Sequence, residues 1–325
     1  MDLSAPPRVH LFFTQPAAAT ALRRALGPSI ADRLVEFDAF LPHLSAGADV
    51  PTADTLLRCR TDAGAQHVIS EFVAARADHP HDLALASVVT TVDAPTLWEM
   101  LEPTRHRLRA PETSFVATAT QIEHATVVVF TDWRSLTGDD LYLLVALVGH
   151  LNPTATVVLL GAETPLTLDR HGFDVAAASL NRAGWMHVLS DTFTPRAKHT
   201  RVCTFRYQNL RPFHPGRLAA LFDAGAGSVL GSNVVRAVGF CRLTSRPHAV
   251  ILWDQCVTEL QVAVLRADAE DCADEPLSFG QDIAFFGVDL DTARLQETLD
   301  ACTLDDDEFL AGPDRWAALP DPLPR

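Results

Sequence analysis

Short, almost fully apolar runs recur along the first half of the chain and predict buried strands. They lie at residues 9–13, 83–94, 126–130 and 154–160, with a shorter run at 34–37. Segments with helical spacing stand between them, at 17–27, 63–76, 95–101, 112–125 and 137–151. Strands without polar alternation, each separated by a helix, are typical of a parallel sheet covered by helices on both faces. We therefore predict an α/β domain over residues 1–195, with residues 41–55 as a loop.

Two details of this domain can be predicted from single residues. Helical spacing in the segment 63–76 places Val68, Phe72 and Val73 on one apolar face. Thr137 precedes a long apolar helix and is a good N-cap, because its hydroxyl can accept a hydrogen bond from the first turn.

The pattern changes after about residue 195. Residues 201–210 alternate between polar and apolar, and further strands are expected at 234–246, 249–256, 258–266 and 282–290. Helices are expected at 214–225 and 291–302. This order, one strand, one helix, four strands and a final helix, predicts an α+β domain over residues 196–325 with its helices on one face of the sheet.

Composition excludes several classes of protein. The chain has 325 residues, of which 48% are hydrophobic, enough for two packed cores and too many for a disordered chain. No apolar run approaches the roughly 18–20 residues that a membrane span needs. The N-terminus lacks the cationic flank of a signal peptide, and the six cysteines are too scattered for a disulfide framework. We expect a cytoplasmic protein without a membrane partner.

Charge is distributed unevenly along the chain. The net charge is −15, and residues 261–325 alone hold 16 Asp and Glu against 4 Arg. Residues 192–222 hold six basic residues and no acid. The basic strip and the acidic tail are expected to face each other or water within one domain. The alternative is that residues 192–222 bind an anion, RNA or the ribosome.

The first domain has a nucleotide-binding pattern of strands, but no phosphate-binding motif. A Walker A loop needs glycines whose N–H groups cradle phosphate, a lysine for charge and a hydroxyl for Mg²⁺. After the first strand the chain reads TQPAAATALRRAL, without glycine or lysine. Lys198, the single lysine, lies far away in sequence. The dinucleotide motif G-x-G-x-x-G is absent as well, so no cofactor is expected.

Candidate metal and catalytic residues are few. His79 and His81 stand near Asp82 in an expected loop, and Cys272 stands among carboxylates in an expected hairpin. Solvated loops explain both better than metal sites do. Residues 305–308, DDDE, are typical of a helix N-terminus, where negative charge is favourable. No G-x-S-x-G motif or Cys–His nucleophilic pair is present, and no catalytic residue is predicted.

The second domain resembles a known family. FRYQNLRPFHPGRLAALF, VVRAVGFCRLTSRPHAVILWDQC, DIAFFGVDLDTARLQETLDACTLDDDEF and WAALPDPLP follow in the order and spacing of the C-terminal domain of CobW proteins. RPFHPGRL is the most specific of these motifs. His214 within it invites a metal or acid–base role, but at a junction of strand and helix it is expected to cap or pack. We predict an interaction surface at Arg206, Arg211, Phe213, His214 and Arg217.

The first domain resembles the P-loop GTPase domain of the same family. VVTTVDAPTL, TQIEHATVVVFTDWRSL and LNPTATVV match family segments, and Thr131 and Asp132 stand where its guanine-reading motif has Asn and Lys. We identify Thr14, Thr20, Asp93, Thr131 and Asp132 as the remnant of a nucleotide site. The family's metal-binding C-x-C-C is absent, and Cys59, with His79 and His81, is the candidate that remains for metal.

CobW proteins are GTP-dependent metallochaperones, mostly for zinc and also for cobalt. The resemblance implies this ancestry, while the phosphate, base and metal motifs are all missing. We therefore expect a degenerate member that is not a competent GTPase and acts as an adaptor or regulator in metal homeostasis through a protein partner. Two alternatives stay open. One is a metallochaperone that binds GTP and Zn through unconventional loops, and the other is a ribonucleoprotein-binding module.

Overall fold

The computed structural model describes residues 8–14, 18, 22, 25–26, 34–45, 54–77, 83–101, 112–161, 168, 181–223, 230, 233–246, 249–257, 259–267 and 280–323. They form two compact units. The first unit holds the described residues up to Gly184 and the short stretch Thr194–Lys198. The second unit holds Trp185–Phe193 and the described residues from His199 onward. The predicted boundary at residues 195 and 196 falls inside this interleaved stretch.

The first unit is built on a six-stranded sheet in the order β2-β3-β1-β4-β5-β6, and every pair in it is parallel. The strands are β1 (Arg8–Phe13), β2 (Leu34–Glu36), β3 (Thr55–Cys59), β4 (Ala84–Asp93), β5 (Val127–Thr131) and β6 (Thr156–Leu159). The central strands β1, β4 and β5 are buried almost throughout, as in a sheet covered on both faces, whereas the edge strands β2 and β6 are partly exposed.

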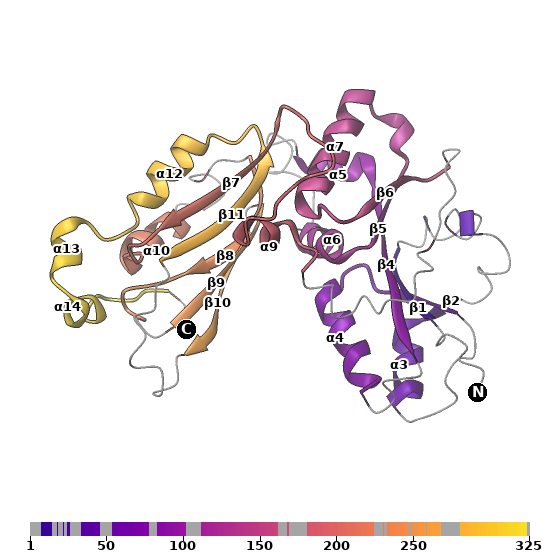
Figure 1. Ribbon diagram of the computed structural model, residues 1–325, viewed down its shortest axis with the longest axis horizontal. Coiled ribbons are helices and arrows are strands. Elements are labelled where there is room, and N and C mark those ends of the chain that lie inside the picture. The colour runs from indigo at the N-terminus through magenta and orange to yellow at the C-terminus, as the bar shows by residue number, and fades with distance from the viewer. Residues whose placement is uncertain are drawn as a thin grey trace. The chain divides into compact units, whose positions relative to one another are not determined.

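Helices connect these strands and cover the sheet (Figure 1). They are α3 (Phe37–Ser45), α4 (Ala65–Ala75), α5 (Ala94–Leu101), α6 (Glu112–His124) and α7 (Gly138–Leu151). Successive residues of β1 point to opposite faces. Leu11 and Phe13 join one hydrophobic cluster and Phe12 joins another. The predicted parallel α/β architecture is confirmed.

Three local predictions in this unit are wrong. Residues 37–45 form helix α3 although 41–45 are predicted as a loop, because burial of Phe37 and Leu44 outweighs the cost of Pro42 inside the helix. Val73 is 38% exposed, and Ile69 takes its place on the buried face of α4. Strand β3 is not predicted at all, since its five residues give too short a pattern.

The second unit is an antiparallel sheet in the order β10-β9-β8-β11-β7. Leu218 and Leu221 of α10, with Leu295 and Leu299 of α12, pack against Trp253 on one face, which confirms the α+β prediction. Trp185 and Phe193 pack on the opposite face, against Phe240 and Phe286. The elements are α9 (Gly184–Leu189), β7 (Val202–Asn209), α10 (Pro215–Asp223), β8 (Val234–Cys241), β9 (Ala249–Cys256), β10 (Glu259–Ala267), β11 (Gln281–Val288), α12 (Thr292–Asp300), α13 (Asp306–Leu310) and α14 (Pro313–Ala317).

Candidate functional site

The carboxyl edge of the parallel sheet collects most of the nucleotide-site residues suggested by the sequence. Thr14 follows β1, Asp93 ends β4 and Thr131 ends β5, with Asp93 and Thr131 paired across the two strands. The strand order changes direction between β1 and β4. Ligands of open α/β sheets bind at such a switch point. The fold therefore brings Thr14, Asp93, Thr131 and Asp132 to the same edge, and Thr20 lies outside the described residues.

Polar groups at this edge are used by the fold itself. The Asp93 carboxylate accepts a 2.9 Å hydrogen bond from the backbone N–H of Thr96 and so caps the first turn of α5. The Thr91 hydroxyl donates to the Phe13 carbonyl across the switch point at 3.3 Å. Thr14 and Thr131 are buried, at 3% and 7% exposure. Asp93 and Thr91 are thus engaged with backbone groups of the chain itself.

The loop after β5 carries two large side chains that bond to the chain after β6. Asp132 adopts the left-handed conformation, with φ of 51°, and opens the 3₁₀ turn η1 (Trp133–Ser135). The Trp133 indole N–H donates to the Leu160 carbonyl at 3.0 Å, and Arg134 donates to the Gly161 carbonyl at 2.6 Å. The Arg134 guanidinium lies 4.4 Å from the centre of the Trp133 ring. Sequence reasoning noted the altered motif but missed this role for its last two residues.

Lys198 cannot serve a phosphate at the carboxyl edge. It lies in the first unit, and its positive charge helps to lower the pKa of His150 at the end of α7. Helix α7 begins after the carboxyl end of β5 and ends before the amino end of β6. Its 14 residues span about 20 Å. Lys198 is therefore at the opposite edge of the sheet from Thr14.

Cys59 is the described member of the metal candidates. It ends β3, is 3% exposed, and burial raises the pKa of its thiol. A raised pKa disfavours the thiolate, which is the form that binds metal. His79 and His81 lie outside the described residues. Within the part of the chain that the structure describes, no three or more His, Cys, Asp or Glu are grouped to hold a metal ion.

The described polar groups at the carboxyl edge contact other parts of the chain. Phosphate binding needs donors and a cation, and the metal needs an oxygen ligand. Asp93 is engaged as a cap, and Lys198 is at the far edge. Trp133 and Arg134 are bonded to the chain after β6.

The second candidate site is the basic strip of the second unit, where arginines meet carboxylates. Arg206 donates from Nε and Nη2 to Asp282, both at 2.7 Å, and from Nη1 to Asp191 at 2.6 Å. Arg201 binds Asp289 at 2.8 Å. The prediction that strip and tail face each other within one domain is confirmed for these arginines.

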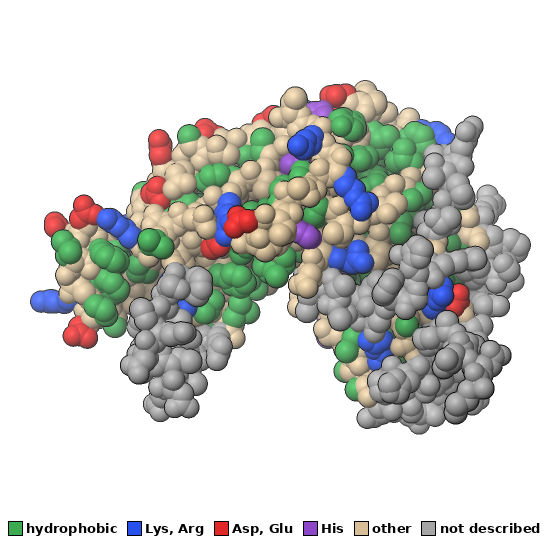
Figure 2. All heavy atoms as spheres, in the orientation of Figure 1, with side chains coloured by type: hydrophobic (Ala, Val, Ile, Leu, Met, Phe, Trp, Pro, Cys, Tyr) green, Lys and Arg blue, Asp and Glu red, His purple; other side chains and the backbone are tan. Residues whose placement is uncertain are grey.

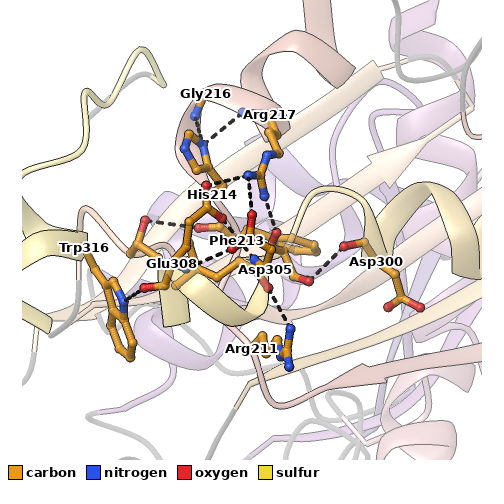
Figure 3. A network of polar contacts seen from close by, with 12 residues as sticks. Arg211, Phe213, His214, Gly216, Arg217, Asp300, Asp305, Glu308 and Trp316 are labelled. Atoms are coloured by element: carbon orange, nitrogen blue, oxygen red, sulfur yellow. Dashed lines mark hydrogen bonds and ion pairs between the residues drawn. The ribbon is translucent and has the colours of Figure 1, made fainter. Parts of the chain in front are cut away.

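The RPFHPGR segment forms the centre of the same network (Figure 3). Arg217 donates to the Thr303 carbonyl at 2.6 Å and to Glu308 at 2.5 Å. Arg211 binds Asp306 and donates to the Leu304 carbonyl. Both arginines thereby hold the chain between α12 and α13.

His214 is an N-cap of α10. Its Nδ1 accepts hydrogen bonds from the backbone N–H groups of Gly216 at 3.1 Å and Arg217 at 3.3 Å. The predicted capping role is confirmed. The acidic run 305–308 also behaves as predicted, because Asp305 and Glu308 form a capping box at the start of α13.

One residue of the predicted interaction surface, Phe213, does not lie at the surface. Phe213 is fully buried, stacks on Tyr207 with ring centres 6.2 Å apart, and lies 6.3 Å from Trp253. Its backbone bridges Leu243 and Thr303. The prediction that Phe213 contacts a partner is wrong, because the aromatic ring completes the core of the second unit.

Comparison with known proteins identifies this unit. Residues 202–303 match the model of the cobalamin synthesis protein cobW C-terminal domain. The second unit therefore contains a CobW C-terminal domain. The RPFHPGR segment and Trp253 lie within the matched residues, while the partners Asp306 and Glu308 lie just beyond them.

Individual relatives are more distant. The zinc-regulated GTPase metalloprotein activator 1 of Dictyostelium discoideum is 24% identical over an alignment of 227 residues, and the match covers 62% of this chain. The chain spans about half the length of this curated relative, 47%. The structure of the Zn(II)-bound YjiA GTPase from E. coli covers 93% of this chain and 100% of that chain, at 12% identity and a TM-score of 0.38. The structure of a Zn(II)-bound triple mutant of YjiA matches at 13% identity and a TM-score of 0.40.

The search for a membrane-spanning element gave a negative result. No helix among the described residues has the length and hydropathy to cross a membrane.

Proposed function

We propose that this chain, which contains a CobW C-terminal domain, acts in metal homeostasis as a non-catalytic adaptor or regulator, through contacts with a protein partner. The observation that carries the proposal is the carboxyl edge of the parallel sheet. Its described polar groups bind local backbone, and the chain offers no lysine to phosphate there. The sequence after β1 also lacks the glycines of a phosphate loop. A family fold without these groups is suited to binding proteins rather than hydrolysing GTP.

The arginine network supports the same proposal against a nucleic-acid role. Arg206, Arg211 and Arg217 each have a carboxylate partner within the second unit. RNA would have to compete with those carboxylates, and binding would fall steeply with salt. We therefore rank the ribonucleoprotein hypothesis below the adaptor.

A second function has one observation in its favour. The Dictyostelium relative is named as a zinc-regulated GTPase metalloprotein activator. A GTP-dependent zinc metallochaperone would need an unconventional phosphate site, built from backbone N–H groups at the start of the helix that the sequence predicts after β1. Such a site binds anions without lysine, and its affinity would be low.

Isothermal titration calorimetry separates the two functions. The purified full chain is titrated with GTP and Mg²⁺, and in a second experiment with Zn²⁺. The adaptor proposal expects no GTP binding tighter than about 10 μM, which corresponds to roughly −7 kcal/mol. Tighter binding that is lost in Asp93→Asn would overturn it.

The zinc experiment has its own control. One equivalent of Zn²⁺ bound by the wild type and lost in Cys59→Ser would restore a metallochaperone role. Serine is nearly isosteric with cysteine, so this variant is expected to stay folded, and circular dichroism checks that it does. Equal titrations of wild type and variant agree with the adaptor.

A further inference from the structure

The corner formed by α13 and α14 is ordered without a core of its own. Neither helix has a buried residue. A capping box fixes the first turn of α13, and Gly312 turns the chain with φ of 85°. The Trp316 indole N–H then donates to the Glu308 carbonyl at 2.7 Å and holds α14 against α13 (Figure 3). Hydrogen bonds, rather than buried apolar side chains, therefore hold α13 and α14 together.

Two arginines anchor this corner to the rest of the unit. Arg217 reaches Glu308, and Arg211 reaches Asp306 and lies 5.7 Å from the centre of the Phe309 ring. Both arginines belong to the RPFHPGR segment beside the core residue Phe213. These two contacts connect α13 to the segment that carries Phe213.

The apolar side chains of the corner point outward. Leu310 is 82% exposed and Phe309 is 41% exposed, and the Phe309 ring stacks on Trp316 with centres 5.2 Å apart. Figure 2 shows hydrophobic side chains at the surface over α13 and α14, with charged side chains around them. A short segment that is fixed by polar contacts and exposes large apolar groups is typical of a binding surface.

The charge around this surface limits what can bind there. Asp307 and Asp314 are exposed, while Asp306 and Glu308 are already paired with Arg211 and Arg217. Arg315 is the basic residue that α14 itself contributes. The whole chain carries a net charge of −15. A partner with basic side chains is favoured, while an anionic membrane or a second acidic copy would be repelled.

We propose that the α13–α14 corner docks a basic amphipathic helix of a protein partner. The corner offers side chains and no strand edge, so a partner has to be recognised through side chains, as an apolar helix face is. Its apolar residues would contact Leu310 and the Phe309–Trp316 pair, and its Lys or Arg would face Asp307 and Asp314. This inference rests on the proposed adaptor function for the role of the partner. The docking itself involves no residue of the nucleotide-site remnant.

The test is fluorescence anisotropy with the full-length protein and a labelled 18-residue helical peptide of Leu and Lys. The same peptide with Glu in place of Lys is the charge control. Leu310→Ser removes the most exposed apolar group of the corner without touching the polar contacts. Leu265→Ser is the matched control, because Leu265 is 52% exposed on β10, the strand at the other edge of the sheet from β7.

The expected result is binding of the Leu–Lys peptide that weakens at least fivefold in Leu310→Ser and is unchanged in Leu265→Ser. The Leu–Glu peptide is expected to bind at least tenfold more weakly than the Leu–Lys peptide. Absence of binding, equal loss in both variants, or equal binding of both peptides would overturn the proposal. So would a wild-type dimer in sedimentation analysis that Leu310→Ser dissociates, since the occupant would then be a second copy. The calorimetric test of nucleotide binding can fail without affecting any of these outcomes.

Discussion

The carboxyl edge of the parallel sheet and the end of β7 use their polar residues in opposite ways. At the first, side chains bind backbone groups: Asp93 caps α5, and Trp133 and Arg134 donate to the carbonyls of Leu160 and Gly161. At the second, the charged residues Arg211 and Arg217 cross from one element to another and bind carboxylates far away in sequence. The described groups of the first edge thus bind backbone, while those of the second bind carboxylates.

This difference teaches that residue type alone is a poor guide to function in this chain. The RPFHPGR motif holds three groups common in active sites, yet His214 caps a helix and both arginines anchor α13. The surface left for a partner is formed instead by residues with no catalytic chemistry, such as Leu310 and Phe309. The predictions below test each side of the comparison.

The largest expected effect concerns the structural role of Phe213. Phe213→Ala should lower the free energy of unfolding of the second unit by about 3–5 kcal/mol, because a fully buried aromatic ring is lost. Leu210→Ala is the control, since Leu210 is 84% exposed and its loss should change stability by less than about 0.5 kcal/mol. Urea unfolding measures both. Equal midpoints for the two variants would contradict a core role for Phe213.

Mild acid should destabilise the first unit. Burial lowers the pKa of His10 and of His150 from 6.5 to about 4. Between these values the unfolded chain binds protons that the folded chain does not, so stability falls as pH falls from 6.5 to 4. The slope is at most about 1.4 kcal/mol per pH unit for each histidine. Hydrogen exchange, corrected for the intrinsic exchange rate, measures this slope of stability against pH. The double variant His10→Asn, His150→Asn should show a smaller slope.

The second unit should resist the same change of pH. Burial alone would raise the pKa of Asp300 and Asp321, but the hydrogen bonds that they accept outweigh it and lower both values below 3.8. Stability from these groups is complete above their ordinary pKa and is lost only as pH falls below about 4. Peptides of the second unit should therefore keep their exchange protection at pH 5. Parallel loss of protection in both units would contradict this distinction.

A smaller effect separates the two arginine environments. Arg217→Ala should cost about 1–2 kcal/mol, because it removes bonds to a carbonyl and a carboxylate of another element. Arg134→Ala is the counterpart at the sheet edge and should cost less than about 1 kcal/mol, since its stacking on Trp133 is exposed. Denaturation at low and high salt measures both. A larger loss of stability in Arg134→Ala than in Arg217→Ala would contradict the prediction.

The smallest effect is expected at the helix caps, where the two units behave alike. His214→Ala and Thr137→Ala each remove a side-chain acceptor for the first turn of a helix. Each should cost about 1 kcal/mol, and His214→Asn should restore most of the loss at its position. Thermal unfolding detects the difference. If asparagine is no better than alanine, His214 contributes through packing rather than capping.

The sequence by itself determined the two sheets and most of their helices, because apolar runs and alternation are local patterns with local causes. It also determined the caps at Thr137 and His214, which depend on neighbouring residues. It failed where distant burial overrides a local signal, as at Pro42 within α3.

Only the tertiary structure decided what the polar residues do. Pairing of Arg217 with Glu308 joins residues 91 positions apart, and the place of Lys198 at the far edge of the sheet depends on the direction of α7. The outward direction of Leu310 is equally invisible in sequence, since an apolar residue in a short helix is normally buried. Contacts between distant segments set these roles, and no local pattern encodes them.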